Sequence, residues 1–330
     1  MQKKIWIVLI ACLTAILMIA PSVTAKKFEL KIGLDLAPGT PDDLAAQKIA
    51  EVVRELTDGQ LTFKIFTVGQ LGSAMDQIES VAQGTQDAML MEISWFGNLL
   101  KDWSVLAMPF TFQNQDHLNA FLDSPLSDPV KKEALDKYNM RILETNFNRL
   151  PRVILSKNPV FTPEDLQGVK FRVPAIPMYM KSWEAMGTKT TRITWGETYL
   201  GIKQGVADAM EGLFDGVVAM RFHEVAPYIT MTNHLHTTAI FVINEDVWEQ
   251  LPFEYQEALK KAVQEGKKVF NEETQKLKTV QEKRVMEEDG AIIYVDVQPF
   301  KEKIQFLVEQ EENAGTWSKG LYDKIQELEY

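Results

Sequence analysis

The sequence predicts an α/β protein built of two domains, and three observations support this prediction. Residues 28–92 alternate strand, helix, strand, helix and strand at the spacing of a parallel sheet with helices on its faces. Without its leader the chain has about 305 residues, more than one hydrophobic core usually serves. A segment of about 38 residues, 252–289, has the composition of one long helix. Because no low-complexity linker or internal repeat separates two halves, we expect the chain to cross between the domains more than once, with the crossing segments as the hinge.

The leader is the segment 1–25, which has the features of a secretory signal. Lys3 and Lys4 give it a positive start, residues 5–20 are almost wholly apolar, and Val-Thr-Ala at 23–25 offers small residues for cleavage after Ala25. Its apolar core is shorter than the about 20 residues that a spanning helix needs. We therefore expect the mature protein to be soluble and exported.

Cys12 offers a competing interpretation, because it stands in the local pattern of a lipoprotein cleavage site. Few apolar residues would precede that cleavage, and the positions after it remain apolar instead of forming a polar tether, so we reject lipidation. Cys12 is the only cysteine. Its removal with the leader excludes disulfides, thiol catalysis and thiolate metal sites in the mature chain.

The charge balance makes nucleic acid an improbable partner. Without Lys3 and Lys4, the 35 basic residues become 33, against 46 acidic ones, for a net charge of about −13. The acidic residues are spread along the chain in mixed patches that are typical of solvated helix faces. An arginine that an anion could reach would therefore be notable.

In the first part of the chain, strands are expected at 28–34 and 61–66 with a helix between them. Thr40 is the predicted N-cap of that helix, Pro41 occupies its first turn and Gly59 follows its end. A second unit follows with a helix ending at Gly84 and a strand at 87–92.

The second part of the chain continues the alternation of helices and strands after a loop that contains Pro109. The expected helices are 117–124, 129–139, 177–187 and one within 194–208, and the expected strands are 140–147, 152–156, 168–173 and a short segment near 209–210. A capped helical turn, 162–168, leads into the strand in which Val169, Phe171 and Val173 alternate with Lys170 and Arg172. An isolated arginine on such a strand is normally solvated, so Arg172 needs further support before a function is assigned to it.

The long segment 252–289 could also form a coiled coil or two helices broken near Gly266. Its apolar residues recur at roughly helical intervals but do not keep a strict heptad. We therefore favour one long helix laid across both domains.

Signatures of enzymes are mostly absent. The chain contains no G-x-S-x-G, no G-x-x-x-x-G-K-[ST], no G-x-G-x-x-G and no H-E-x-x-H. His234 and His236 would share one face of a strand, but no third ligand lies nearby, so we prefer hydrogen-bonding histidines near a crossing point to a metal site. Glu211 and Asp215 are four residues apart and could form an acid/base pair. Without a nucleophile, metal or histidine beside them, they are weak indicators of catalysis.

Arginines and aromatic residues gather instead at the ends of expected elements. Arg152 opens the strand 152–156, and Arg172 closes the strand before Pro174. Aromatic residues in or beside loops next to strands are Trp95, Phe96, Phe147 and Trp195. In α/β folds, ligands bind in the crevice outside the strand ends, where a guanidinium can grip a carboxylate while an aromatic ring packs on the ligand. Core packing is the alternative for each aromatic residue.

Six segments of the chain, in this order, resemble the hallmark segments of a known family. They are GQLGSAMDQIESVAQGTQDAML, LAMPFTF, RVILSKNPVFTPEDLQGVKFRVP, TWGETYLGIKQGVADAMEG, YITMTNH and WEQLPFEYQEALKKAV. The family is that of the periplasmic solute-binding proteins of tripartite ATP-independent periplasmic (TRAP) transporters. The resemblance covers essentially the whole mature chain.

The resemblance implies two α/β domains that close on a ligand, joined by crossing strands and a long spanning helix. It also implies that Arg172 forms the principal salt bridge to a ligand carboxylate and that Arg152 is the second arginine of the site. Trp195 falls where an aromatic residue packs on the ligand, and Asp35 lies at a strand end that lines the cleft. The candidate ligand-binding residues are Arg172, Arg152, Trp195, Asp35, Trp95, Glu92, Gly212 and Asp215.

Two positions depart from the family pattern. Ala74 stands where some members, including sialic-acid binders, carry glutamate, and Gly212 stands where many carry asparagine. These departures leave the far end of the ligand without its usual polar partners and favour a ligand less polar or smaller than sialic acid.

The leading hypothesis is a monomeric periplasmic protein without cofactor or metal that captures an organic acid and delivers it to the small and large membrane subunits of a TRAP transporter. The alternatives are an exported α/β hydrolase or lyase using Glu211 and Asp215, and a ligand-sensing subunit of a membrane receptor. We expect residues 26–149 with 238–277 to form the first domain, and 150–237 with 278–330 the second.

Overall fold

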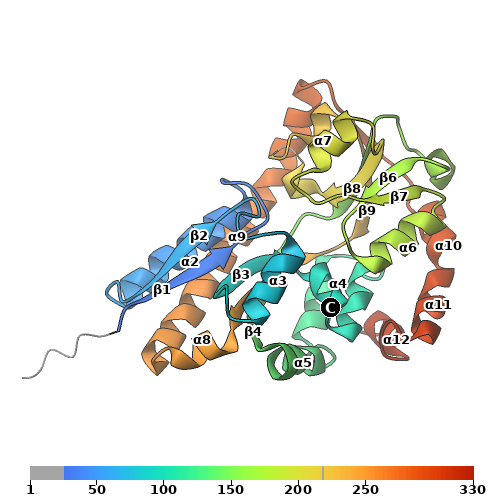
Figure 1. Ribbon diagram of the computed structural model, residues 1–330. Coiled ribbons are helices and arrows are strands. Elements are labelled where there is room, and N and C mark those ends of the chain that lie inside the picture. Colours follow the sequence, from blue (N-terminus) through green and yellow to red (C-terminus); the bar gives the residue numbers. More distant parts are fainter. Residues whose placement is uncertain (1–25, 218) are drawn as a thin grey trace, which may run out of the picture.

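Two mixed β-sheets, each flanked by helices, form the two halves of the molecule (Figure 1). The computed structural model describes residues 26–217 and 219–330, so the predicted signal segment, its cleavage after Ala25 and Cys12 lie outside the described residues. The strand order is β2-β1-β3-β10-β4 in the first sheet and β11-β9-β5-β8-β6-β7 in the second. The predicted α/β class with two sheets is confirmed.

The first sheet contains the predicted parallel unit. Strand β1 (Phe28–Gly33) pairs in parallel with β2 (Leu61–Phe66) and β3 (Ala88–Glu92), while β10 (Thr238–Asn244) runs antiparallel to β3 and β4 (Met140–Asn148). The helices of this half are α2 (Pro41–Leu56), α3 (Ala74–Ala82), the 3-10 helices η1 (Ile93–Asn98) and η2 (Lys101–Ala107), α4 (Gln115–Asp123), α5 (Asp128–Tyr138) and α8 (Glu245–Gln250).

Thr40 lies at the predicted N-cap of α2, but its side chain does not cap the helix. The Thr40 hydroxyl donates to the carbonyl of Ala37 at 2.7 Å, so it is turned away from the helix N–H groups. The carboxylate of Asp43 in the first turn accepts the N–H of Gly39 at 2.8 Å and holds the incoming loop. The capping role predicted for the Thr40 side chain is therefore wrong.

The second sheet contains β5 (Arg152–Ser156), β6 (Lys170–Val173), β7 (Lys189–Arg192), β8 (Ala209–Leu213), β9 (Tyr228–Leu235) and β11 (Ala291–Tyr294). Its helices are η3 (Pro163–Leu166), α6 (Pro177–Ala185), α7 (Thr198–Lys203), η4 (Phe214–Gly216) and η5 (Phe222–Glu224). The edge strands β7 and β11 were not expected. Strand β7 reads Lys-Thr-Thr-Arg, without the apolar alternation of a half-buried strand, and it pairs with β6 alone.

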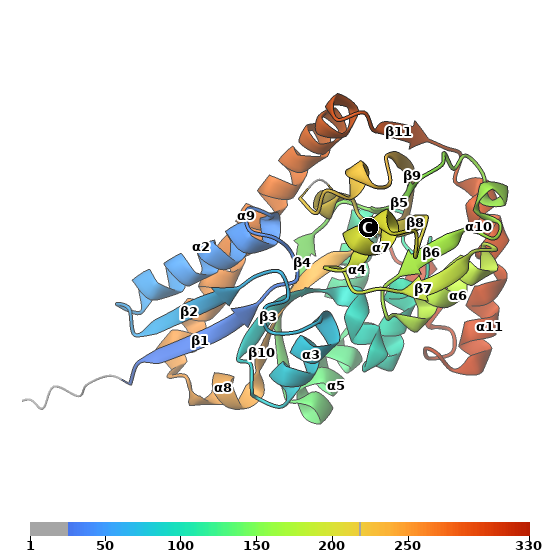
Figure 2. The same cartoon turned by 45° about the horizontal axis from the view of Figure 1, so that its top comes forward.

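Three connections join the halves. The chain passes from β4 to β5 through residues 149–151 and returns from β9 to β10 through 236–237. Helix α9 (Phe253–Glu287) is a single helix of 35 residues that packs on α2 and β4 in the first half and on η4 and β11 in the second. Figure 2 shows α9 running beside α2 and on to β11. The predicted crossing strands and spanning helix are thus confirmed, and α9 continues through Gly266 without a break.

The C-terminal helices α10 (Gln298–Ile304), α11 (Phe306–Ala314) and α12 (Leu321–Gln326) were not expected. Helices α10 and α11 lie near α6, whereas α12 contacts the first half (Figure 1). The Nε2 atom of His117 is 2.7 Å from the carbonyl oxygen of Ile325, and Gln326 donates to the carbonyl of Thr111 at 2.7 Å. The domain boundaries near 149 and 237 and the assignment of 278–330 to the second domain stay predictions.

In residues 26–217 and 219–330, none of the helices combines the length and the apolar composition that crossing a bilayer requires.

At Gly266, helix α9 packs directly against α2. A Cβ at Gly266 would lie 2.4 Å from Cγ1 of Ile49 and 3.0 Å from the carbonyl oxygen of Ala45. Gly266→Ala should therefore lower the free energy of unfolding, because overpacking costs about 1–3 kcal/mol and alanine gains only about 1 kcal/mol over glycine in a helix. Denaturant unfolding measures the difference. The control Glu272→Ala, at an exposed position of α9, should change stability by less than about 0.5 kcal/mol; a Gly266→Ala variant as stable as this control would contradict the packing.

Candidate functional site

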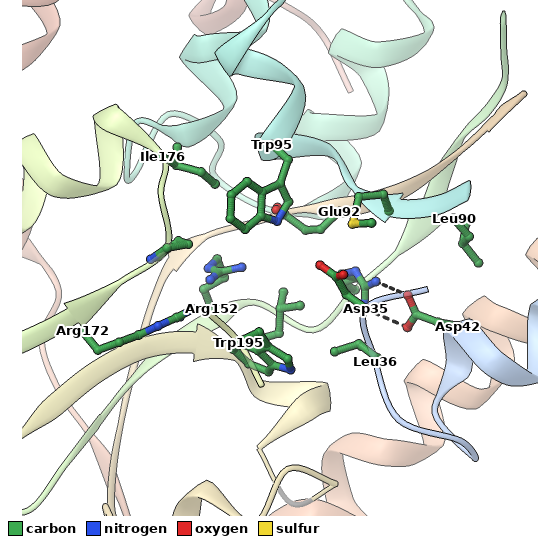
Figure 3. A pocket seen from close by; sticks show the side chains of 14 residues that line it. Asp35, Leu36, Asp42, Leu90, Glu92, Trp95, Arg152, Arg172, Ile176 and Trp195 are labelled. Atoms are coloured by element: carbon green, nitrogen blue, oxygen red, sulfur yellow. Dashed lines mark hydrogen bonds and ion pairs between the residues drawn. The ribbon is translucent and has the colours of Figure 1, made fainter. Parts of the chain in front are cut away.

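A cleft between the two halves gathers most of the predicted ligand-binding residues (Figure 3). The first half contributes Asp35, Leu36, Asp42, Leu90, Met91, Glu92 and Trp95. The second half contributes Arg152, Arg172, Pro174, Ile176, Trp195 and Leu213, and Arg149 comes from the connection between β4 and β5. The inner cavity measures about 40 Å³. A larger hollow of about 450 Å³ shares Asp35, Trp95 and Trp195 with it and extends the cleft outward.

Arg172 is a buried guanidinium without a carboxylate partner among the described residues. Strand β6 carries it, and the residue is 1% exposed. Its Nε donates to the carbonyl of Ile193 at 2.9 Å, its Cζ lies 5.5 Å from the ring centroid of Trp195, and Nη1 has no hydrogen-bond partner in the described part of the chain. Burial lowers the pKa of Arg172 to about 10, against the opposing charge of Glu211. A desolvated cation of this kind is stabilised by an anion that reaches it from the cavity.

Arg152, in contrast, forms an ion pair with a protein carboxylate. Its Nε and Nη2 donate to the two oxygens of Glu211 at 2.5 and 2.8 Å, and its guanidinium faces the ring of Tyr179 at 5.0 Å. Burial acts to raise the pKa of Glu211, but the charge of Arg152 outweighs it and holds this pKa at about 2. Glu211 therefore stays ionised at neutral pH as the counterion of Arg152.

The two histidines lie where β9 leaves the second sheet. His234 shares a hydrogen bond between Nδ1 and the hydroxyl of Thr232 at 2.8 Å, and its Nε2 is 3.8 Å from Glu211. Burial lowers the pKa of His234, and burial together with the neighbouring His234 lowers the pKa of His236 to about 4. His234 is therefore the hydrogen-bonding histidine near the crossing that the sequence favoured.

Arg149 is the residue of the cleft that the sequence did not single out. Its guanidinium donates to both oxygens of Asp42 in the first turn of α2, and Nη1 also donates to Asp215 in η4 at 3.0 Å. All three side chains are buried. One arginine in the connection between the sheets thus joins a carboxylate of the first half to a carboxylate of the second. The sequence feature that could have identified Arg149 is its position between two predicted strands that belong to different domains.

The first half presents two further carboxylates to the cavity. Asp35 follows β1 and accepts a hydrogen bond from Gln77 at 3.2 Å. Glu92 ends β3, and its Oε1 accepts the hydroxyls of Ser94, at 2.7 Å, and Thr237. Burial and then the charge of Asp42 raise the pKa of Asp35 to about 7, against the effect of Arg149. Asp35 is therefore only partly ionised at neutral pH.

Trp95 and Trp195 lie on opposite sides of the cavity (Figure 3). The indole of Trp195 lies over two glycines: a Cβ at Gly212 would be 3.4 Å from its ring atoms and one at Gly216 would be 3.0 Å away. Its other neighbour is Phe222, whose ring meets it edge-on. A Cβ at Gly212 would make only an ordinary contact with the indole, whereas one at Gly216 would press on it, so the glycine at position 216 leaves room for Trp195.

Six of the eight residues predicted to bind the ligand line the inner cavity, and the other two lie behind residues that line it. Gly212 does not line this cavity but contacts Trp195, and Asp215 does not line it but binds Arg149. Phe96 and Phe147 are fully buried and pack on Trp103 and Phe270 as core residues. Ala74 lines the outer hollow.

Comparison with known proteins agrees with this architecture. The family of bacterial extracellular solute-binding proteins, family 7, matches residues 32–313. The chain is 28% identical over 312 residues, covering 94% of it and 95% of the relative, to the sialic acid-binding periplasmic protein SiaP of Vibrio cholerae. It is 29% identical over 252 residues, 75% of it and 76% of the relative, to the 2,3-diketo-L-gulonate-binding periplasmic protein YiaO of Escherichia coli.

Solved structures share the fold at low sequence identity. A TRAP periplasmic solute-binding protein of Pseudomonas putida F1 with bound D-glucuronate superposes with a TM-score of 0.85 at 24% identity, covering 92% of this chain and 98% of that one. One from Roseobacter denitrificans with bound β-D-glucuronate has a TM-score of 0.86 at 23% identity, covering 91% and 100%.

Two α/β halves joined by two strand crossings and one spanning helix, with a charged cleft between them, form the fold of the solved TRAP periplasmic solute-binding proteins. The chain belongs to the bacterial extracellular solute-binding proteins of family 7. This membership, together with the pairing of Glu211 and Asp215 by arginines, replaces the hydrolase or lyase alternative.

Glu211→Gln should destabilise the protein strongly at pH 7, because removing one partner of a buried ion pair costs about 3–5 kcal/mol. The pKa of Glu211 is lowered from 4.5 to about 2 in the folded protein, so its stabilisation is present above about pH 4.5 and declines as the pH falls toward 2. Denaturant unfolding of the parent protein and of Glu211→Gln should therefore show a difference in the free energy of unfolding that decreases as the pH falls from about 5 to about 3. An exposed Glu272→Gln control should show no such difference, and a pH-independent difference for Glu211→Gln would contradict the ion pair.

Proposed function

We propose that the protein binds an organic acid in the cleft and delivers it to the small and large membrane subunits of a TRAP transporter. It acts in the periplasm of a Gram-negative bacterium as a monomer, after cleavage of its signal peptide behind Ala25. The observation that carries this proposal is the buried guanidinium of Arg172, which faces the cavity without a carboxylate partner in the described residues.

The relatives support an acid as the ligand. SiaP of Vibrio cholerae is named for sialic acid and YiaO of Escherichia coli for 2,3-diketo-L-gulonate. Related structures hold glucuronate, galacturonate or L-galactonate, and another has density interpreted as pantoate. Each of these compounds is an acid. The kinship with TRAP proteins favours delivery to a transporter over the alternative role as a sensing subunit of a receptor.

The roles of the two arginines differ in this proposal. Arg172 receives the ligand carboxylate through Nη1 and Nη2, because its Nε is already bonded to Ile193. Arg152 keeps its bidentate pair with Glu211 and contributes positive potential and one wall of the cavity. Trp195 packs on the ligand body on one side and Trp95 on the other.

Arg172→Ala should weaken binding severely, because truncating one partner of a desolvated charge pair costs about 2–5 kcal/mol, roughly 30-fold to several thousand-fold in affinity. Arg172→Lys should also bind more weakly than the parent, since a compact ammonium cannot replace the planar fork. The measurement is titration calorimetry with the tightest-binding acid of a panel of sugar acids and hydroxy acids. Arg54→Ala, an exposed arginine of α2, is the control and should bind normally. An Arg172→Ala variant that binds like this control would contradict the proposal.

Ligand binding should close the two halves on each other. Each half supplies only part of the cleft, and hydrogen bonds join the halves from Tyr179 to Ser94, at 3.2 Å, and from Asn98 to the carbonyl of Ala175, at 3.2 Å. Small-angle scattering should show a smaller radius of gyration when the acid is added at saturation. Arg172→Ala at the same acid concentration should keep the larger value. An unchanged radius for the parent protein with saturating acid would contradict ligand-driven closure.

A further inference from the structure

When the ion pairs within the protein are left out, the charged groups of the cleft are unevenly distributed between the two halves. Glu211 satisfies Arg152 by two hydrogen bonds, and Arg149 is shared by Asp42 and Asp215. The charged groups of the cavity wall that remain are Arg172 from the second half, and Asp35 and Glu92 from the first. One cation and two carboxylates therefore face a ligand from opposite walls (Figure 3).

The two carboxylates retain unused acceptor capacity. Only Oδ1 of Asp35 accepts a hydrogen bond, from Gln77, and only Oε1 of Glu92 does so, from two hydroxyls; the second oxygen of each has no donor among the described residues. An ionised carboxylate is an acceptor without donors. The wall opposite Arg172 is thus built to receive hydrogen-bond donors and to repel a second anionic group.

We infer that the ligand is a monocarboxylate whose far end carries a hydrogen-bond donor, a hydroxyl or an ammonium group, and that Asp35 and Glu92 select it against dicarboxylates. This inference rests on the proposed function, in which Arg172 holds the single carboxylate. A dicarboxylate would have to place its second charge against two acids, and like charges brought together across an interface suppress the wrong partner.

The surroundings of Asp35 strengthen this selection. Burial and then the neighbouring carboxylates of Asp42 and Glu92 oppose its ionisation, whereas Arg149 favours it, and the pKa of Asp35 is raised to about 7. A further negative charge nearby would raise this pKa again and would bind only with uptake of a proton. A donor group needs no such uptake, because it bonds the ionised carboxylate directly.

Two matched pairs of probes test the inference by titration calorimetry at pH 8: D-gluconate against D-glucarate, and 4-hydroxybutyrate against succinate. In each pair the skeleton is the same and only the far end changes from a hydroxyl to a carboxylate. We expect the monocarboxylate of the pair that fits the cleft to bind at least tenfold more tightly. A tighter dicarboxylate would overturn the inference and leave the proposed function intact, whereas binding of none of these acids and of no other acid of the panel would contradict both.

The variant Asp35→Asn tests the role of this residue, because asparagine keeps the shape of the side chain and removes its charge. We expect the preference for the monocarboxylate to fall at least threefold, mainly through tighter binding of the dicarboxylate. Glu29→Gln, an exposed carboxylate on β1, is the matched control and should keep the parent preference. Circular dichroism and thermal unfolding verify that both variants fold. An Asp35→Asn variant with the parent preference would overturn the role of Asp35.

The pH dependence of the affinity gives a second readout, with 4-aminobutyrate as the ammonium probe and D-glucarate or succinate as the dicarboxylate probe. Protonation of Asp35 as the pH falls from 8 to 6 removes its attraction for an ammonium group, so the affinity for 4-aminobutyrate should fall. The same protonation removes its repulsion of a second carboxylate, so the affinity for the dicarboxylate should rise. Both slopes should disappear in Asp35→Asn, and a slope of the opposite sign, or one that persists in Asp35→Asn, contradicts the inference.

Discussion

The guanidinium of Arg172 is the group on which the arrangement of the cleft depends. It is buried, it has one carbonyl and one indole as neighbours, and no carboxylate of the described residues pairs with it. Burying a charge without a partner opposes folding, and the cost falls when an anion enters. The neighbouring groups keep the site available: Glu211 is bonded to Arg152, and Gly216 leaves room for the indole of Trp195. The protein thus carries an unsatisfied cation that a ligand can satisfy.

The hinge is tied to the same charged groups. Arg149 lies on the first strand crossing and bonds Asp42 at the start of α2 and Asp215 after β8, and Gln281 of α9 donates to the carbonyl of Asp215. The crossing segment, a helix of each half and the spanning helix therefore meet at one buried cluster. Such buried ion pairs add little net stability, but they require defined geometry. Arg149 accordingly fixes how the two halves approach each other. On the neighbouring loop, burial and then the charge of Asp42 raise the pKa of Asp35.

Sequence patterns predicted the elements whose residues alternate or recur clearly. Strands β1 to β3, the helices between them and the long helix α9 were expected because their apolar periodicity and Pro/Gly boundaries are strong, whereas β7 and β11 lack that periodicity and depend on one neighbouring strand each. Arg172 and Asp35 were assigned to the cleft through the family resemblance. Arg149 was missed because its role arises from Asp42 and Asp215, which are 107 and 66 residues away in the chain. Glu211 was flagged for the wrong chemistry, since its partner Arg152 lies across a strand pair that single-sequence periodicity does not reveal.

A crystal structure of the protein with a bound acid tests the central claim most directly, because it locates the carboxylate. The account predicts that one carboxylate of the acid accepts two roughly parallel hydrogen bonds from Nη1 and Nη2 of Arg172, between the rings of Trp95 and Trp195, while Glu211 remains paired with Arg152. An acid bound elsewhere, or a ligand carboxylate held by Arg152 after displacing Glu211 while Arg172 remains unpaired, would contradict it.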